Sequence, residues 1–176
     1  MLNKINIIPI ITDHFGTLRV PRTQKVLFRD LAVFFGAPVV FGALVAWAFP
    51  NPPDSFLTLS ITVHTLFIPL LVNVLFVIYG IQEKHDGEQS NKERKLLVEL
   101  YKNLCYSVLV SFASVAITAF AQACVKPIFD LIDPTMTPRA NAIASFLIYA
   151  LIIHLFLTVL MIVRRTHTLL SAEFRE

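Results

Sequence analysis

The sequence predicts an all-α integral membrane protein, a bundle of four transmembrane helices with both termini on the cytoplasmic side. Of its 176 residues, 56% are apolar and only 15% are charged, whereas a soluble domain has about 45–50% apolar and roughly 25% charged residues. Four uncharged stretches are each long enough to cross a hydrocarbon core of about 30 Å as a helix. None of them alternates apolar and polar residues as the strands of a membrane barrel do.

Residues 1–30 are expected to form a cytoplasmic or interfacial segment. Pro9 interrupts the apolar run Ile7–Ile11 and charged residues follow it, so no cleavable signal peptide is expected. Residues Ile5–Leu18 are expected either to lie on the cytoplasmic membrane surface or to pack as an ordered loop under the bundle.

The expected transmembrane helices occupy residues 31–49, 56–80, 105–125 and 141–163. The first ends at Pro50–Pro53, because prolines stop a helix. Pro38 and Pro69 should kink the first two helices. Residues 81–104 are expected to form a cytoplasmic loop whose last one or two turns extend the third helix, and residues 164–176 a cytoplasmic tail.

The positive charges determine the orientation of these helices. Thirteen of the fifteen lysines and arginines lie in the N-terminal segment, in the connection 81–104 and in the tail. Because such residues are retained on the cytoplasmic side, both termini are expected to be cytoplasmic.

No Asp, Glu, Lys or Arg lies in the core of any expected span. Small four-helix multidrug transporters are therefore a poor match, because proton-coupled exporters commonly use a buried carboxylate. Cys105 and Cys124 lie about 28 Å apart along one helix, too far for a disulfide within one chain, which excludes a quinone-linked disulfide-forming enzyme. Both cysteines are expected to be apolar fillers.

His64, Asn73 and His154 are the remaining intramembrane candidates, at depths of about 12, 26 and 20 Å from the outer ends of their helices. They are expected to hydrogen-bond between helices. The alternatives are a pH-responsive pore lining and a haem held by His64 and His154, for which an offset of about 8 Å is unfavourable.

A polar stripe follows one face of the third helix at spacings of 4, 3, 4 and 4 residues; it consists of Ser107, Ser111, Ser114, Thr118 and Gln122. It is expected to be a packing seam, within the chain or between subunits. The alternative is a narrow pore lined by copies of this helix from several subunits.

The charged connection before the third helix is the best expected docking site for a cytosolic protein, through Glu83, Lys84, Lys92, Arg94 and Lys95. His85, Asp86 and Glu88 lack a fourth ligand, so no metal site is expected. The sequence has no glycine-rich phosphate loop, serine nucleophile elbow or zinc-protease helix. No catalytic residue, cofactor or nucleic-acid partner is therefore expected.

The short chain, its internal termini and its proline- and arginine-bearing start (Ile8-Pro9-Ile10, His14-Phe15, Leu18-Arg19, Arg22) resemble the small four-helix membrane proteins of bacterial antiphage defence systems. The resemblance is one of layout over the whole chain. It implies a homo-oligomer in the bacterial inner membrane that senses membrane disturbance or permeabilises the membrane, coupled to a cytosolic protein.

The expected function is therefore non-enzymatic: an oligomeric, lipid-embedded protein of the inner membrane acting as a channel-like effector or a membrane sensor. The alternatives are a haem-binding redox subunit and a passive membrane anchor for a cytosolic complex.

Overall fold

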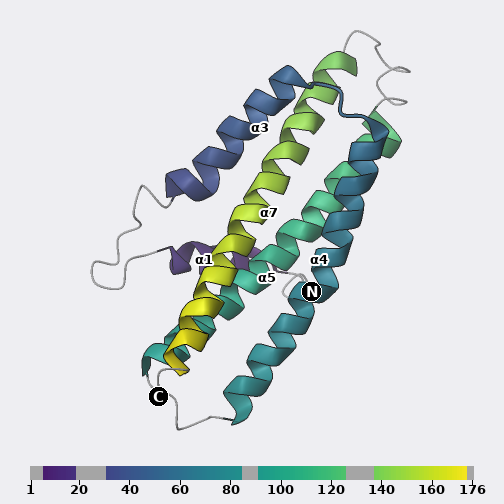
Figure 1. Ribbon diagram of the computed structural model, residues 1–176. Helices are drawn as coiled ribbons and strands as arrows, with labels where there is room; N and C mark the ends of the chain where they lie inside the picture. The colour runs from purple at the N-terminus through teal and green to yellow at the C-terminus, as the bar shows by residue number, and fades with distance from the viewer. Residues whose placement is uncertain (1–5, 19–30, 85–90, 126–136, 174–176) are drawn as a thin grey trace.

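The computed structural model describes residues 6–18, 31–84, 91–125 and 137–173, and every regular element in these ranges is a helix. In chain order the elements are α1 (Ile8–Thr17), the π-helix η2 (Ala32–Gly36), α3 (Ala37–Ala48), α4 (Asp54–Lys84), α5 (Asn91–Phe120), the π-helix η3 (Ala121–Val125) and α7 (Thr137–Glu173). Figure 1 shows α3, α4, α5 and α7 as a bundle whose successive helices run alternately up and down, with the short helix α1 across its lower half.

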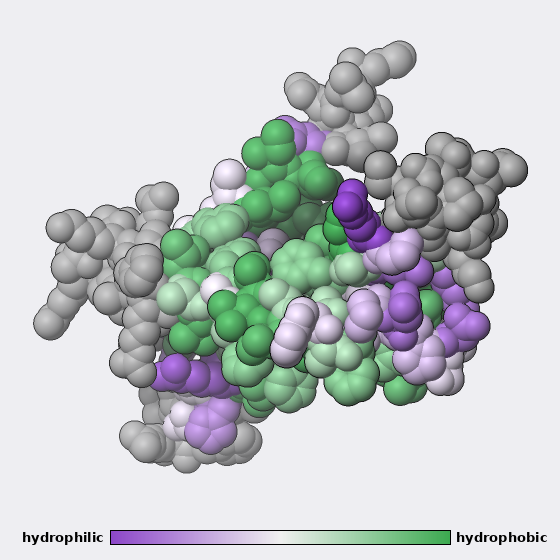
Figure 2. All heavy atoms as spheres, turned by 90° about the horizontal axis from the view of Figure 1, so that it is seen from above, coloured by the Kyte–Doolittle hydropathy of each residue, from purple (hydrophilic) through white to green (hydrophobic). Residues whose placement is uncertain are grey.

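Three of the helices are long and apolar enough to cross a membrane: Asp54–Gln82, Glu93–Cys124 and Pro138–Leu169. The fourth apolar helix, Ala32–Ala48, is shorter. Figure 2 shows hydrophobic residues over much of the visible surface, as expected for helices that face lipid.

The connection between the second and third expected helices is shorter than predicted. α4 continues to Lys84 and α5 begins at Asn91, so helix occupies most of the range 81–104 that was expected to be a loop. The charged extension of the third helix is accordingly several turns long rather than one or two. It is held by an apolar cluster of α4, α5 and α7: Leu71, Ile78, Leu97, Leu100, Leu104 and Ile162.

α3 packs closely on α7. A Cβ atom added to Gly42 would lie 2.9 Å from Cβ of Ala150 and 3.0 Å from its backbone, closer than van der Waals contact allows. Gly42 therefore permits this helix crossing, as small residues do where membrane helices meet.

α1 is a helix rather than the ordered loop considered as one alternative, and it packs against α5. His14, Thr17 and Leu18 are buried on its inner side, whereas Ile7 and Ile8 at its start are exposed. α1 lies beside the lower end of α3 in Figure 1, where it covers the part of the bundle that the shorter helix does not reach.

Candidate functional site

The most polar part of the interior is a set of five side chains that we call the inner cluster: His14 and Thr17 of α1, Asn103 and Tyr106 of α5, and His154 of α7, all buried. The His14 ring is stacked on the Tyr106 ring, with centroids 3.8 Å apart and planes within 4° of parallel. His14 Nδ1 and Thr17 Oγ1 each lie 2.9 Å from Asn103 Oδ1. The cluster therefore joins α1 to the long helices.

Hydrogen bonding determines the tautomer of His154. Its Nδ1 lies 2.8 Å from the carbonyl oxygen of Phe34, which can only accept, so Nδ1 carries the proton. Its Nε2 then accepts a hydrogen bond from the Tyr106 hydroxyl at 2.8 Å. Tyr106 is thus stacked on one histidine and hydrogen-bonded to another.

Pro38 removes the usual helical donor of the Phe34 carbonyl. In a regular helix the N–H of residue 38 would bond to the carbonyl of residue 34, but proline has no N–H. The chain forms the π-helix η2 just before this proline, so the predicted distortion of the first helix is present. It supplies the acceptor for His154.

Two ion pairs flank the inner cluster, between α7 and α5 and between α5 and α1. Arg165 Nη1 lies 3.1 Å from Glu99 Oε2, and Arg165 Nη2 donates to the carbonyl of Thr17 at 3.1 Å. Lys102 Nζ lies 3.2 Å from Asp13 Oδ1. Burial lowers the pKa of His14 from 6.5 to about 4, with smaller contributions in the same direction from His154 and Arg165, so His14 is neutral at pH 7.

The polar stripe of α5 lies inside the chain. Ser107, Ser111, Ser114 and Thr118 are fully buried, whereas Gln122 at the end of the stripe is exposed. The packing seam was the expectation for this stripe, and these four side chains are enclosed by helices of the same chain. The alternative of a pore lined by copies of this helix would need them to face a second copy. Of the two seams considered, the stripe forms the one within the chain.

Two residues of the stripe satisfy their hydroxyl groups locally. Ser107 donates to the carbonyl of Asn103 and Ser111 to that of Ser107, each at 2.9 Å. This bond to the preceding helical turn lowers the free-energy cost of burying a serine hydroxyl in a membrane helix. The hydroxyls of Ser114 and Thr118 have no such partner among the described residues.

α4 and α7 carry buried polar side chains as well. Counted along each helix from its end nearest residues 85–90, His64 of α4 and Ser111 of α5 both lie at about 30 Å, and Ser60 and Ser114 both lie at about 35 Å. The antiparallel pair α4 and α5 therefore carries its polar side chains at matching levels. We call the whole set the buried polar line: Ser60, His64, Asn103, Ser107, Ser111, Ser114, Thr118, Ser145, His154 and Thr158.

Several atoms of this interior are not hydrogen-bonded to the described part of the protein. They are Ser60 Oγ, His64 Nε2, Ser114 Oγ, Thr118 Oγ1, Asn103 Nδ2 and, in the inner cluster, His14 Nε2. A buried polar atom without a partner costs about 1–3 kcal/mol, and in proteins such atoms are commonly satisfied by buried water.

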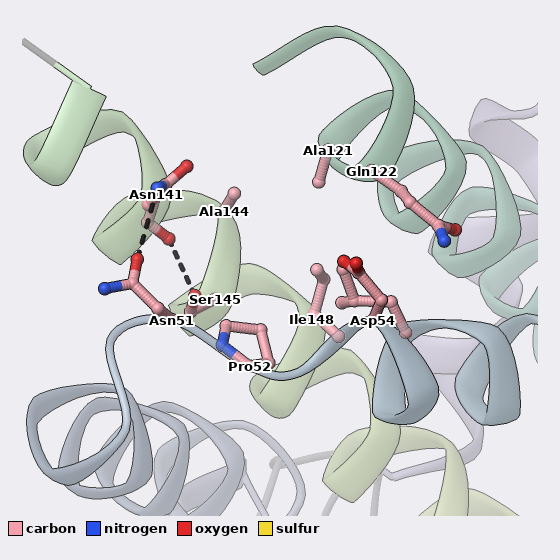
Figure 3. A pocket seen from close by; sticks show the side chains of 10 residues that line it. Asn51, Pro52, Asp54, Ala121, Gln122, Asn141, Ala144, Ser145 and Ile148 are labelled. Atoms are coloured by element: carbon pink, nitrogen blue, oxygen red, sulfur yellow. Dashed lines mark hydrogen bonds between the residues drawn. The ribbon is translucent and has the colours of Figure 1, made fainter. Parts of the chain in front are cut away.

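A cavity of about 380 Å³, which we call the outer pocket, is lined by Ser145 of the buried polar line and by Gln122 of the stripe. Figure 3 shows the Asp54 side chain on the side of the pocket toward α5 and η3, where Gln122 lies. On the opposite side Asn141 Nδ2 donates to Asn51 Oδ1 at 3.1 Å, and Ser145 Oγ lies 2.7 Å from the carbonyls of both Asn141 and Pro50. The outer pocket is therefore lined by polar side chains at the same end of the bundle as Thr118 and Gln122.

The three intramembrane candidates are not brought together. His64 is buried and its Nδ1 bonds to the Ser60 carbonyl of its own helix, at 2.7 Å. Asn73 is exposed on α4. His154 does not bridge His64 and Asn73: its hydrogen-bond partners are Tyr106 and Phe34. Both ring nitrogens of His154 have protein partners, which is unfavourable for ligation of a haem iron.

Of the expected docking residues, the structure describes the side chains of Arg94 and Lys95, which are exposed on α5. Glu83, Lys84 and Lys92 lie at the helix ends, and their side chains are outside the described residues, as are residues 85–90.

Sequence reasoning missed most of the inner cluster. Asn103 could have been found, because it lies one helical turn before Ser107 on the same face. Pro38 could have indicated a free carbonyl at Phe34. The partners of His14 could not have been found, because His14 and Asn103 are 89 residues apart in the chain.

Comparison with protein-family models, curated proteins and solved structures finds no match for this chain.

Proposed function

We propose that this protein is a non-enzymatic, multi-pass protein of the bacterial inner membrane that acts as a channel-like effector, and that it conducts protons along the interior of a single chain. The shorter helix Ala32–Ala48 would span together with the three long helices, with both termini in the cytoplasm. The proposal departs from a pore between several subunits, and no second copy is needed for conduction.

The carrying observation is the buried polar line. Each successive turn of α5 from Asn103 to Thr118 has a buried polar side chain, and α4 and α7 carry further buried polar groups. The exposed Gln122 continues the stripe at the outer pocket. Hydroxyl, imidazole and amide groups both donate and accept hydrogen bonds. With water at the unpartnered atoms, they would form a relay between the outer pocket and the inner cluster.

The close packing of the line favours protons over larger species. Four successive residues of the stripe are fully buried, so a hydrated ion would have to displace them. A proton instead moves by exchange along hydrogen bonds and needs only single waters. The resemblance to defence proteins suggests that such a leak serves to depolarise the membrane, coupled to a cytosolic partner.

Two threonines, Thr118 buried in the line and Thr62 exposed on α4, allow a matched test. In proteoliposomes with a pH-sensitive dye inside, Thr118→Val should lower proton flux at least tenfold, because it removes a hydroxyl from the line at nearly constant volume. Thr62→Val should leave flux unchanged, since Thr62 is exposed and bonds to the carbonyl of Thr58 in its own helix. Absence of flux in the wild type would favour the passive anchor instead.

A further inference from the structure

We infer that the cavity between α1 and the lower part of α5 binds the phosphate group of an anionic phospholipid. This inner pocket has a volume of about 450 Å³ and is lined by Gly16, Thr17, Arg94, Lys95, Val98, Glu99 and Lys102. The inference rests on the orientation proposed above, and it does not depend on proton conduction.

The charges of the pocket favour an anion. The acid that lines it, Glu99, is paired with Arg165, and Lys102 is paired with Asp13. Arg94 and Lys95 are exposed and have no ion pair within the described part of the chain. The pocket therefore has two positive charges, Arg94 and Lys95, that are not paired within the described residues, next to Lys102, whose ion-pair partner Asp13 is exposed. Arginine and lysine both bind phosphate through charge-assisted hydrogen bonds.

The level of the pocket matches that of lipid headgroups. A core of about 30 Å measured down α7 from Asn141 ends near Met161. Arg165 lies one turn beyond this level and contacts Glu99, which lines the pocket. In the proposed orientation the pocket therefore lies where the phosphates of the cytoplasmic leaflet are located.

The surface of α5 above the pocket favours a lipid over a free phosphate. Arg94, Val98 and Tyr101 are followed on the same helical face by Val108 and Phe112. Val98, Tyr101 and Phe112 are exposed large side chains. A charged lower end and an apolar continuation on one face correspond to the headgroup and acyl chain of a phospholipid.

The test is lipid binding to the purified full chain, counted by native mass spectrometry. Wild type should bind phosphatidylglycerol more tightly than phosphatidylcholine, and Arg94→Gln and Lys95→Gln should each weaken phosphatidylglycerol binding about fivefold. The matched control is Arg164→Gln, which removes an exposed arginine of α7 outside the pocket and should leave binding unchanged. Thermal unfolding without added lipid checks that all variants are folded.

Three results would overturn the inference. Equal affinity for the two lipids would show that the headgroup charge does not determine binding. An equal loss of phosphatidylglycerol affinity in Arg164→Gln would show that the lipid is attracted to the whole basic end of the bundle rather than bound in the pocket. Displacement of phosphatidylglycerol by millimolar inorganic phosphate would assign the pocket to a free phosphate. None of these results bears on proton flux, so this inference and the proposed function can fail separately.

Discussion

His14 combines complete burial with a ring nitrogen that has no partner in the described part of the protein. One face of its imidazole is covered by Tyr106, its Nδ1 bonds to Asn103, and its Nε2 is enclosed without a hydrogen bond to the described residues. A protonated imidazole in this position would gain a charge that nearby Arg165 disfavours. Protonation of His14 would therefore weaken the packing of α1 on α5.

The folded protein should lose stability as the pH falls from 6.5 toward 4. The pKa of His14 is lowered to about 4 by burial, so in this window the unfolded chain takes up a proton that the folded chain does not. This contribution to stability is complete above pH 6.5 and decreases by up to about 1.4 kcal/mol per pH unit below it.

Unfolding in detergent at pH 7 and pH 5, for wild type and His14→Gln, measures this effect. The variant should lose less stability than the wild type between the two pH values. Equal losses would mean that His14 does not carry the pH dependence.

Among the elements, α5 is the one whose role could best be read from the sequence. Its polar residues recur with helical spacing, so a polar face was predictable from Ser107 to Gln122, and four of these residues are buried together. The spacing does not show which other helices pack against this polar face. Burial of Ser107 to Thr118 depends on how α4 and α7 pack on α5, which is decided by contacts between residues far apart in sequence.

α1 could be predicted only in part. Its apolar composition indicated a segment at the membrane surface or under the bundle, and Pro9 is at the start of the helix, where proline is tolerated. Its docking depends on the stacking of His14 on Tyr106 and on the hydrogen bonds of Thr17 and His14 with Asn103. A single histidine in a short helix gives no signal for such a tertiary contact.

The crossing of α3 and α7 should be sensitive to one added methyl group. Gly42→Ala should destabilise the protein by about 1–3 kcal/mol, because the new Cβ would overlap Ala150 and the helices would have to separate. Gly80→Ala is the control: none of the described neighbours lies within 4 Å of its added Cβ, so it should be neutral or stabilising by up to about 1 kcal/mol. Thermal unfolding in detergent compares them; similar behaviour of the two variants would contradict this packing.

For the whole molecule, the four-span orientation has a direct chemical test. Single cysteines at Asn51 and at His167, in a chain with Cys105 and Cys124 replaced by alanine, should react differently with a membrane-impermeant maleimide on intact spheroplasts. Asn51→Cys should be labelled at once because it lies at the proposed outer end. His167→Cys should be labelled only after lysis. Labelling of both positions before lysis would show that the termini are not cytoplasmic.

The fold class was predictable at this scale because apolar helix length and charge distribution are properties of continuous segments. Three long apolar helices were recovered. The helix bounds differed mainly where charged residues continue a helix beyond the apolar core: at Lys84, from Asn91, and from Arg164 to Glu173, in the range expected to be a tail. The site was less predictable, since the inner cluster joins separate segments of the chain.

The most direct measurement of the central claim is proton flux through single chains. Protein is reconstituted at an average below one chain per vesicle, and vesicles are examined individually for loss of an imposed pH gradient. If each chain contains its own path, the fraction of leaking vesicles should rise in proportion to the protein added and equal the fraction that contains a chain. A leak that appears only in vesicles holding two or more chains would contradict a path inside one chain.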